Sequence, residues 1–120
     1  MSFINCISVE EAETLLDTHA NVLLLDCRDA RAFCQDHHPR AIHLNDFNLR
    51  AFLKHTPKDI QLVIYCYHGH SSQDFAKLFA DFDFQNCYSV DGGFEAWRHY
   101  LFNEQPVRYR INQPVTAQVA

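Results

Sequence analysis

The sequence predicts an α/β fold in which helices flank a mostly parallel, five-stranded sheet. Segments with strand character alternate with segments of helical periodicity along most of the chain, which is the pattern of a parallel sheet. The run at residues 22–25 is apolar without interruption, as in a strand that is covered on both faces. The 120 residues are 48% hydrophobic and 13% aromatic, which is enough to build one core without disulfides.

The first strand and the first helix are expected close to the N-terminus. Residues 3–7 have strand character, and Ser8 and Glu11 form the pattern of a capping box at the start of a helix. Apolar residues then recur at helical spacing. The helix should therefore run from Val9 to about Thr18.

A short helix and a short strand should follow the apolar strand at residues 22–25. Asp29 is suited to cap a helix over residues 30–35, with Phe33 facing inward. Pro39 interrupts the chain after this helix, and residues 41–44 read as the next strand.

The third helix is expected to contain Phe47 and Leu53. Asn45 or Asp46 is suited to cap it, because short polar side chains accept hydrogen bonds from the first free N–H groups of a helix. Pro57 should end this region.

Two further strand–helix pairs complete the predicted fold. The strands are expected at residues 61–65 and 87–90, and the helices at 72–80 and 94–100. Residues 91–93, Asp-Gly-Gly, are a turn signal between the last strand and the last helix.

The chain is expected to form one domain, with its last helix anchored in the core by Phe94 and Trp97. From Pro106 onward the sequence is polar and rich in small residues. We therefore expect a domain over residues 1–105 and a loosely held tail over residues 106–120.

Charge and hydropathy exclude several classes of protein. The net charge of -5 argues against a surface for nucleic acid. Residues 1–20 include acidic residues and lack the apolar core of a signal peptide. No segment approaches the roughly 20 apolar residues needed to span a bilayer. A soluble, cytoplasmic protein without nucleic-acid or membrane partners is expected.

The five cysteines are expected to be free thiols, because their number is odd and their spacing is scattered. No CxxC pair occurs, and the side chains of the adjacent His37 and His38 should diverge. The sequence therefore predicts neither a metal site nor a cofactor.

Cys66 is the candidate nucleophile. It follows the strand at residues 61–65 and opens a polar loop that leads into the next helix. A thiol at the end of a strand, facing the N–H groups at the start of a helix, lies where anions are stabilised. Because the thiolate is the nucleophilic form of cysteine, this position favours covalent chemistry over a packing role.

The loop after Cys66 is expected to surround an anion with hydrogen-bond donors. The backbone N–H groups from Tyr67 to Ser71 can form an anion nest, and Gly69 permits the turn that this requires. The hydroxyl groups of Ser71 and Ser72 are candidate donors and candidate caps for the helix.

Two interpretations of His68 and His70 stay open. Both residues lie in the loop after Cys66. Histidine carries partial positive charge near neutral pH, so they are candidate contacts for an anionic substrate. Equally, they are ordinary exposed loop residues without a specific task.

Three motifs together resemble the rhodaneses, the family of thiosulfate sulfurtransferases. The motifs are Leu24-Leu25-Asp26-Cys27-Arg28-Asp29 with its continuation to Ile42, the loop Cys66-Tyr67-His68-Gly69-His70-Ser71-Ser72, and the segment from Tyr88 to Trp97 around Asp91-Gly92-Gly93. This chain differs from the usual pattern at Asp36, Arg40 and His70. The resemblance implies a rhodanese-like three-layer sandwich.

The resemblance also implies a double-displacement reaction. The Cys66 thiolate would attack the outer sulfur of thiosulfate, release sulfite and leave a Cys66 persulfide. Cyanide or a thiol would then accept the sulfur, as in a thiosulfate:cyanide sulfurtransferase, and a small protein dithiol such as thioredoxin is one candidate acceptor.

The remaining polar and sulfur-containing side chains are expected to have structural roles. Asp26 and Arg28 should join loops through an ion pair or hydrogen bonds. The other four cysteines should be packing residues: Cys6, Cys27, Cys34 and Cys87.

Two other classes of function are weighed against sulfur transfer. Cysteine-based phosphatases and arsenate reductases share this type of fold, but a phosphatase loop needs an arginine where this chain has Ser72. Non-catalytic binding modules commonly lack the cysteine that this chain keeps as Cys66.

Overall fold

The central sheet has five strands, and the order across it is β1-β5-β4-β2-β3. A computed structural model describes residues 3–103 of the chain. Every pair of neighbouring strands is parallel, so the prediction of a five-stranded α/β sheet is confirmed and "mostly parallel" becomes all parallel. The strands are β1 (Asn5–Ile7), β2 (Val22–Asp26), β3 (Ile42–His43), β4 (Gln61–Tyr65) and β5 (Asn86–Val90).

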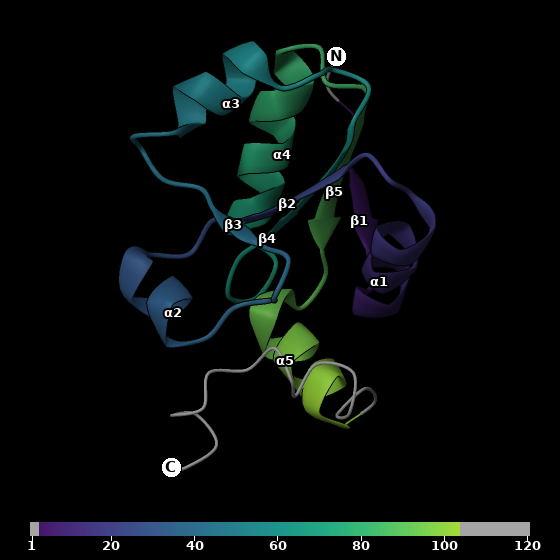
Figure 1. Cartoon of the computed structure of the whole chain (residues 1–120), viewed down its shortest axis with the longest axis vertical. Helices are drawn as coiled ribbons and strands as arrows, with labels where there is room; N and C mark the ends of the chain where they lie inside the picture. The colour runs from purple at the N-terminus through teal and green to yellow at the C-terminus, as the bar shows by residue number, and fades with distance from the viewer. Residues whose placement is uncertain (1–2, 104–120) are drawn as a thin grey trace.

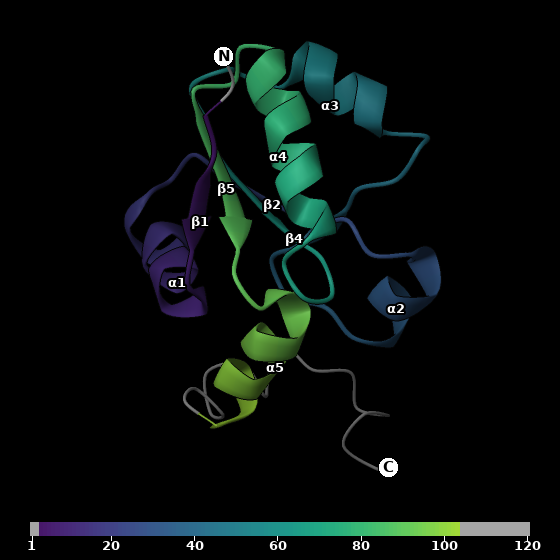
Figure 2. The same ribbon diagram turned by 180° about the vertical axis from the view of Figure 1, so that it is seen from behind.

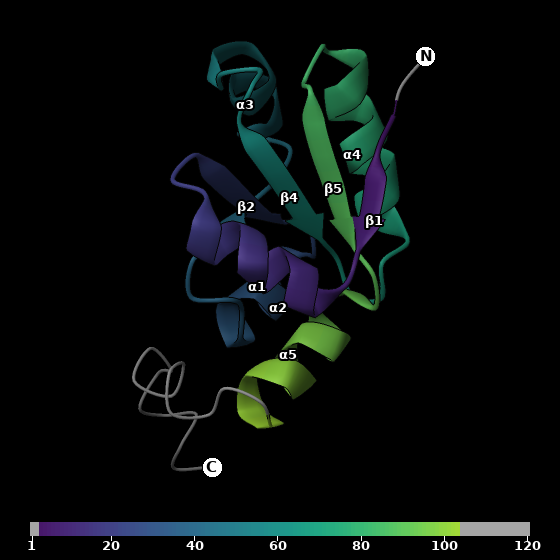
Figure 3. The ribbon, with the colours of Figure 1, turned by 90° about the vertical axis from the view of Figure 1, so that its right-hand side faces the viewer.

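Within residues 3–103, four helices connect the strands and a fifth follows the last strand (Figure 1). Helices α1 and α5 pack on one face of the sheet, and α3 and α4 on the other. Figure 3 shows α1 and α4 on opposite sides of the strands. The helices are α1 (Val9–Thr18), α2 (Ala30–Gln35), α3 (Leu49–His55), α4 (Ser71–Asp81) and α5 (Gly93–Asn103).

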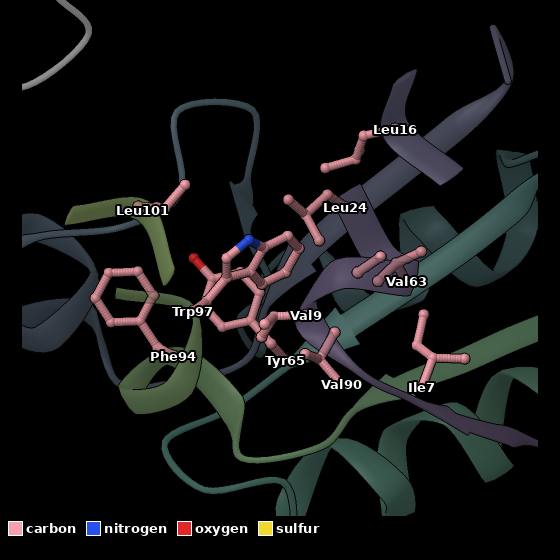
Figure 4. Close-up of a cluster of buried hydrophobic side chains, with 11 residues drawn as sticks. Ile7, Val9, Leu16, Leu24, Val63, Tyr65, Val90, Phe94, Trp97 and Leu101 are labelled. Atoms are coloured by element: carbon pink, nitrogen blue, oxygen red, sulfur yellow. The ribbon is translucent and has the colours of Figure 1, made fainter. Parts of the chain in front are cut away.

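The core under α1 and α5 is built around Trp97, which is fully buried. Its ring meets the ring of Tyr65 edge to face, with the centroids 5.4 Å apart, while Phe94 stacks on Tyr65 from the other side of the cluster (Figure 4). Burial of such a side chain stabilises the fold by roughly 1.5–3 kcal/mol. The expectation that Trp97 and Phe94 anchor the last helix is confirmed.

A buried polar cluster joins four segments of the chain next to this core. Glu13 of α1 accepts a hydrogen bond from the Trp97 indole nitrogen at 2.9 Å and lies 2.8 Å from the ring of His38. The backbone N–H of His38 donates to the hydroxyl of Tyr65 at 3.1 Å. These contacts bind the segment before β3 to α1, α5 and β4, because unpaired polar groups at such a depth would be costly.

The core under α3 and α4 places the start of α4 beside the end of β4. Phe79 and Ala76 of α4 are fully buried against Leu62 and Ile64 of β4. The carboxyl ends of all five parallel strands lie at one edge of the sheet, where the loop between β4 and α4 turns (Figure 2). This packing fixes that loop between two rigid elements.

Two details of the predicted elements can be compared with the structure. The capping box at Ser8 and Glu11 is confirmed in both directions. The predicted start of the third helix is wrong: α3 begins at Leu49, and Phe47 lies in the preceding turn, 97% exposed. The Asn45 side chain accepts bonds from the backbone of Phe47 and Asn48, so it stabilises this turn instead of the helix.

The expected tail at residues 106–120 lies outside the described residues. Between residues 3 and 103, no helix is long and apolar enough to cross a membrane.

Candidate active site

Cys66 is the first residue after β4 and is only 3% exposed. The strand ends here, and the chain turns through residues 67–70 into α4. The sulfur therefore lies near the N-terminal end of an eleven-residue helix, where the helix dipole favours negative charge.

Hydrogen-bond donors surround the Cys66 sulfur. The backbone N–H of Gly69 donates to it at 3.1 Å, and the Ser72 hydroxyl lies 3.3 Å away. Ser72 is itself 2.7 Å from the hydroxyl of Ser89 on β5, and both serines are fully buried. When Cys66 is a thiolate, the Ser72 hydroxyl donates to the sulfur and Ser89 donates to Ser72, which forms a short relay of donors.

Cys27 is the neighbour of Cys66 across the sheet. Strands β2 and β4 are in register up to the pair Asp26 and Tyr65, and the Cys27 N–H donates to the Tyr65 carbonyl at 2.9 Å. The two cysteines are therefore the next pair in this register. They lie on the same face, and each side chain is the largest cause of the shifted pKa of the other.

The pKa values of these two thiols are shifted in opposite directions. The hydrogen bond from Cys27, followed by those from Ser72 and Gly69, lowers the pKa of Cys66 to about 4 against the opposing effect of burial. The same hydrogen bond, together with burial and the charges of Cys66 and Asp26, raises the pKa of Cys27 above its ordinary range. Cys66 is therefore the thiolate and Cys27 the thiol that donates to it.

Two glycines allow the loop to pack closely at this point. Gly69 has a φ of +96°, and a Cβ there would lie 3.1 Å from the Gly92 nitrogen. At Gly93, a Cβ would lie 2.5 Å from the carbonyl oxygens of Cys66 and Tyr67. Only glycine fits such a conformation at such a distance.

The start of α5 is hydrogen-bonded to the loop that follows Cys66. The backbone N–H of Phe94 donates to the Cys66 carbonyl at 2.7 Å, and that of Glu95 donates to the Tyr67 carbonyl at 3.3 Å. The free N–H groups at the start of this helix thus find their partners in the loop. The predicted turn at residues 91–93 also fixes the orientation of the candidate nucleophile.

Asp26 and Arg28 form a buried ion pair beside the loop. Two guanidinium nitrogens of Arg28 contact the Asp26 carboxylate, the closer at 2.7 Å, and Arg28 also donates to the Asp36 carbonyl at 2.6 Å. The guanidinium lies over the ring of Phe94, 4.1 Å from its centroid. Arg28 thus links the end of β2, the end of α2 and the start of α5.

The other predicted loop residues differ in exposure. Tyr67, His68, His70 and Ser71 are exposed. Tyr67 donates its hydroxyl proton to Asp29, the residue that caps α2. His70 occupies the N-cap position of α4 without a side-chain cap bond, so the expectation that Ser71 and Ser72 cap this helix is wrong.

A hollow of about 690 Å³ opens beside the loop, between α1 and α5. His68 of the loop lines it together with Glu10, Glu95 and His99. Within residues 3–103, no three His, Cys, Asp or Glu side chains converge as a metal site.

Sequence reasoning missed two residues that touch the candidate nucleophile or its donors. Cys27 packs against the core under α3 and α4 as expected, but its effect on the pKa of Cys66 was not predicted, and Ser89 was not singled out. The sequence shows a cysteine close to the end of each of two expected strands, at residues 22–25 and 61–65, but it does not show that these strands are neighbours. The packing role is wrong for Cys6 and Cys34, which are exposed, whereas Cys87 is buried as expected.

Comparison with known proteins agrees with this architecture. The family model for the rhodanese-like domain matches residues 8–100. The thiosulfate sulfurtransferase GlpE of Pseudomonas syringae is 42% identical over 89 residues, which cover 74% of this chain and 82% of that protein.

Solved structures share the fold. A rhodanese-like domain protein from Staphylococcus aureus matches with a TM-score of 0.68 at 20% identity, covering 78% of this chain and 90% of that one. A protein of unknown function from Rhodopseudomonas palustris, described as a possible tyrosine phosphatase, matches with a TM-score of 0.69 at 25% identity over 80% of each chain. With its family model, its relative and its all-parallel sheet in agreement, this chain belongs to the rhodanese-like domain family.

Proposed function

We propose that this protein is a thiosulfate sulfurtransferase that works through a persulfide on Cys66. The observation that carries the proposal is the Cys66 sulfur itself, which has a pKa lowered to about 4 and lies among donors at the carboxyl edge of the sheet. The 42% identity with a protein named as a thiosulfate sulfurtransferase supports thiosulfate as the donor.

In the first step, the Cys66 thiolate attacks the outer sulfur of thiosulfate. A bond forms between the two sulfurs, the sulfur–sulfur bond of thiosulfate breaks, and its electron pair leaves with sulfite. The Gly69 N–H and the Ser72 hydroxyl are already directed at the Cys66 sulfur. Donors fixed in this way stabilise the anions of the reaction without reorganisation.

In the second step, an acceptor takes the outer sulfur and returns Cys66 to the thiolate. Cyanide attacks this sulfur to give thiocyanate, and a thiol attacks it to give a new persulfide. The low pKa of Cys66 makes its thiolate a good leaving group in this step. The hollow beside His68 offers an acceptor an approach to the loop.

Asp26 and Arg28 serve this mechanism as positioning residues. The guanidinium of Arg28 donates to the Asp26 carboxylate and to the Asp36 carbonyl. It also lies over the face of the Phe94 ring. Because Arg28 is committed in this way, it holds the loop in place and does not act as a free cation for the substrate.

Phosphate-ester hydrolysis is the alternative that the Rhodopseudomonas structure raises, because that protein is described as a possible tyrosine phosphatase. In this chain the residue six positions after the nucleophile is Ser72, whose hydroxyl faces the Cys66 sulfur. A serine cannot provide the two-pronged donor that binds phosphate oxygens. We therefore expect no hydrolysis of an aryl phosphate.

The test is to mix the reduced protein with thiosulfate and to measure sulfite release and intact mass. The proposal expects one sulfite per chain and a mass gain of one sulfur atom, which cyanide then removes as thiocyanate. Cys66→Ser should show none of these changes, whereas Cys34→Ser, altered at an exposed cysteine of α2, should behave like the natural chain. Sulfur uptake by Cys66→Ser would overturn the mechanism.

A further inference from the structure

Cys27 and Cys66 are placed as a disulfide pair would be. They directly follow the register pair Asp26 and Tyr65 on adjacent parallel strands, which lie about 4.8 Å apart. Disulfides join residues whose Cα atoms are about 4.4–6.8 Å apart. Because register neighbours share a face of the sheet, both sulfurs point toward the α3 and α4 side, and each side chain is the largest cause of the shifted pKa of the other.

The two sulfurs differ in how they are reached. Cys66 is buried, whereas Cys27 is half-buried. Cys27 lines a cavity of about 380 Å³ whose other walls include Arg28, His43 and Phe75. The hollow beside His68 is lined by different residues. Cys27 is therefore reached through a cavity that is separate from that hollow.

We propose that Cys27 is a resolving cysteine, which attacks the Cys66 persulfide, forms a Cys27–Cys66 disulfide and releases the transferred sulfur as hydrosulfide. This proposal rests on the proposed function, because it begins from the persulfide that thiosulfate would form. It adds a third acceptor, within the chain itself, to cyanide and external thiols.

The step is balanced without any added reagent. Cys27 contributes its thiol, whose sulfur bonds to the Cys66 sulfur while the bond from Cys66 to the outer sulfur breaks. The outer sulfur leaves with the electron pair and takes the proton of Cys27, so that hydrosulfide departs. The Cys27 sulfur is oxidised and the transferred sulfur is reduced, while the Cys66 sulfur exchanges one sulfur–sulfur bond for another.

The persulfide also changes the state of Cys27. In the free enzyme, the proton of Cys27 is held by the hydrogen bond to the Cys66 thiolate, which is the largest cause of its raised pKa. Once the Cys66 sulfur is bonded to a second sulfur, it no longer carries that negative charge. The largest cause that keeps Cys27 protonated is then lost, so Cys27 can give up its proton and attack as the thiolate, which is the nucleophilic form.

An external dithiol completes the cycle. Of the two sulfurs in the disulfide, the accessible one is Cys27, next to the 380 Å³ cavity. Attack there expels Cys66, and the thiol of lower pKa is the better leaving group. The sum converts thiosulfate and two thiols to sulfite, hydrogen sulfide and a disulfide.

The test follows the protein after one round of sulfur uptake. The chain is treated with thiosulfate, freed of excess reagent without oxygen and incubated without an acceptor. Non-reducing intact mass, peptide mapping and trapping of sulfide are then compared for the natural chain, Cys27→Ser and Cys34→Ser. Serine keeps a donor at position 27 but cannot form a disulfide, and Cys34 is the matched control.

The natural chain and Cys34→Ser should lose the added sulfur, release one sulfide per chain and end two hydrogen atoms lighter than the reduced protein. Mapping should link the peptides of Cys27 and Cys66, and Cys27→Ser should keep its persulfide. A persulfide that persists equally in all three chains would overturn this proposal and leave the sulfurtransferase intact. Absence of sulfur uptake in all three chains would overturn both the sulfurtransferase proposal and the resolving role of Cys27. If Cys27→Ser does not fold, the presence or absence of linked Cys27 and Cys66 peptides in the natural chain decides the resolving role.

Discussion

Strands β2 and β4 end side by side, and each is followed by a cysteine, yet the two thiols are in opposite states. After β4, the chain turns at once into α4 and directs the Gly69 N–H and the Ser72 hydroxyl at Cys66. After β2, Cys27 is followed by Arg28, whose guanidinium is bound to Asp26. Cys27 therefore has the negative charge of Asp26 nearby, which raises its pKa, and no bond from Arg28 is among the causes of its shift.

This difference shows that the segment after a strand, and not the strand end itself, decides whether a cysteine is reactive. Both cysteines share an edge and a face of the sheet, and they follow strands that pair with each other. A helix starts after each cysteine, but α4 after Cys66 has eleven residues and α2 after Cys27 has six, and it is Cys66 that has the two directed donors Gly69 and Ser72. Substitutions that change the loop, its donors and its charge one at a time should therefore have separable effects on Cys66.

Gly93→Ala should have the largest effect, because it would displace the carbonyl groups of Cys66 and Tyr67. The added Cβ would lie 2.5 Å from both oxygens, so the loop must shift. A displacement of about 1 Å at a reacting group can cost roughly 100-fold in rate. We expect a loss of that order in kcat/KM for thiosulfate, with helical content retained by circular dichroism; full activity would show that the position of the loop does not matter.

Cys27→Ala should raise the pKa of Cys66, because it removes the first-named cause of its low value. A hydrogen bond to a charged group contributes about 1.5–3 kcal/mol, so the pH midpoint of Cys66 alkylation should rise by about 1 to 2. Cys27→Ser should shift it less, since a hydroxyl still donates. Equal midpoints in the two variants and in the natural chain would remove Cys27 from the account.

Ser72→Ala should shift the same midpoint upward by about 1, because one donor is lost and the Gly69 N–H remains. Ser71→Ala is the matched control, since the neighbouring Ser71 is exposed. A shift of the same size in both variants would mean that the effect comes from α4 as a whole and not from the Ser72 hydroxyl.

His70→Lys should have the smallest effect. His70 is exposed beside the loop, and a lysine there adds a full positive charge for the thiosulfate dianion. An exposed charge pair contributes about 0.2–1 kcal/mol, so KM should fall by about twofold to fivefold at low salt and less at high salt. An unchanged or higher KM at low salt would show that His70 does not face the substrate.

The features of this edge that depend on local sequence could be predicted. The alternation of elements gave the sheet, the capping box of Ser8 and Glu11 gave the start of α1, and the polar loop after β4 singled out Cys66. Each of these depends on residues that are close together in the chain.

The features that depend on strand register could not be predicted in the same way. The contact of Cys27 with Cys66 requires that β2 and β4 be neighbours and in a particular register, and that of Ser72 with Ser89 requires the same of β4 and β5. The buried Glu13 pairs with Trp97, 84 residues later. A single sequence shows no local sign of such partners, and the misplaced start of α3 followed from a turn stabilised by Asn45.

The most direct test of the contrast between the two strand ends is the pH dependence of cysteine alkylation in the natural chain, with each site followed by peptide mapping. The Cys66 thiolate is present above its pKa and lost below it, so its alkylation by iodoacetamide should fall with a midpoint at about pH 4. Cys27 should stay unmodified up to neutral pH, because its pKa is raised. A Cys66 midpoint near the ordinary thiol value of about 8.5, or alkylation of Cys27 before Cys66, would contradict the account.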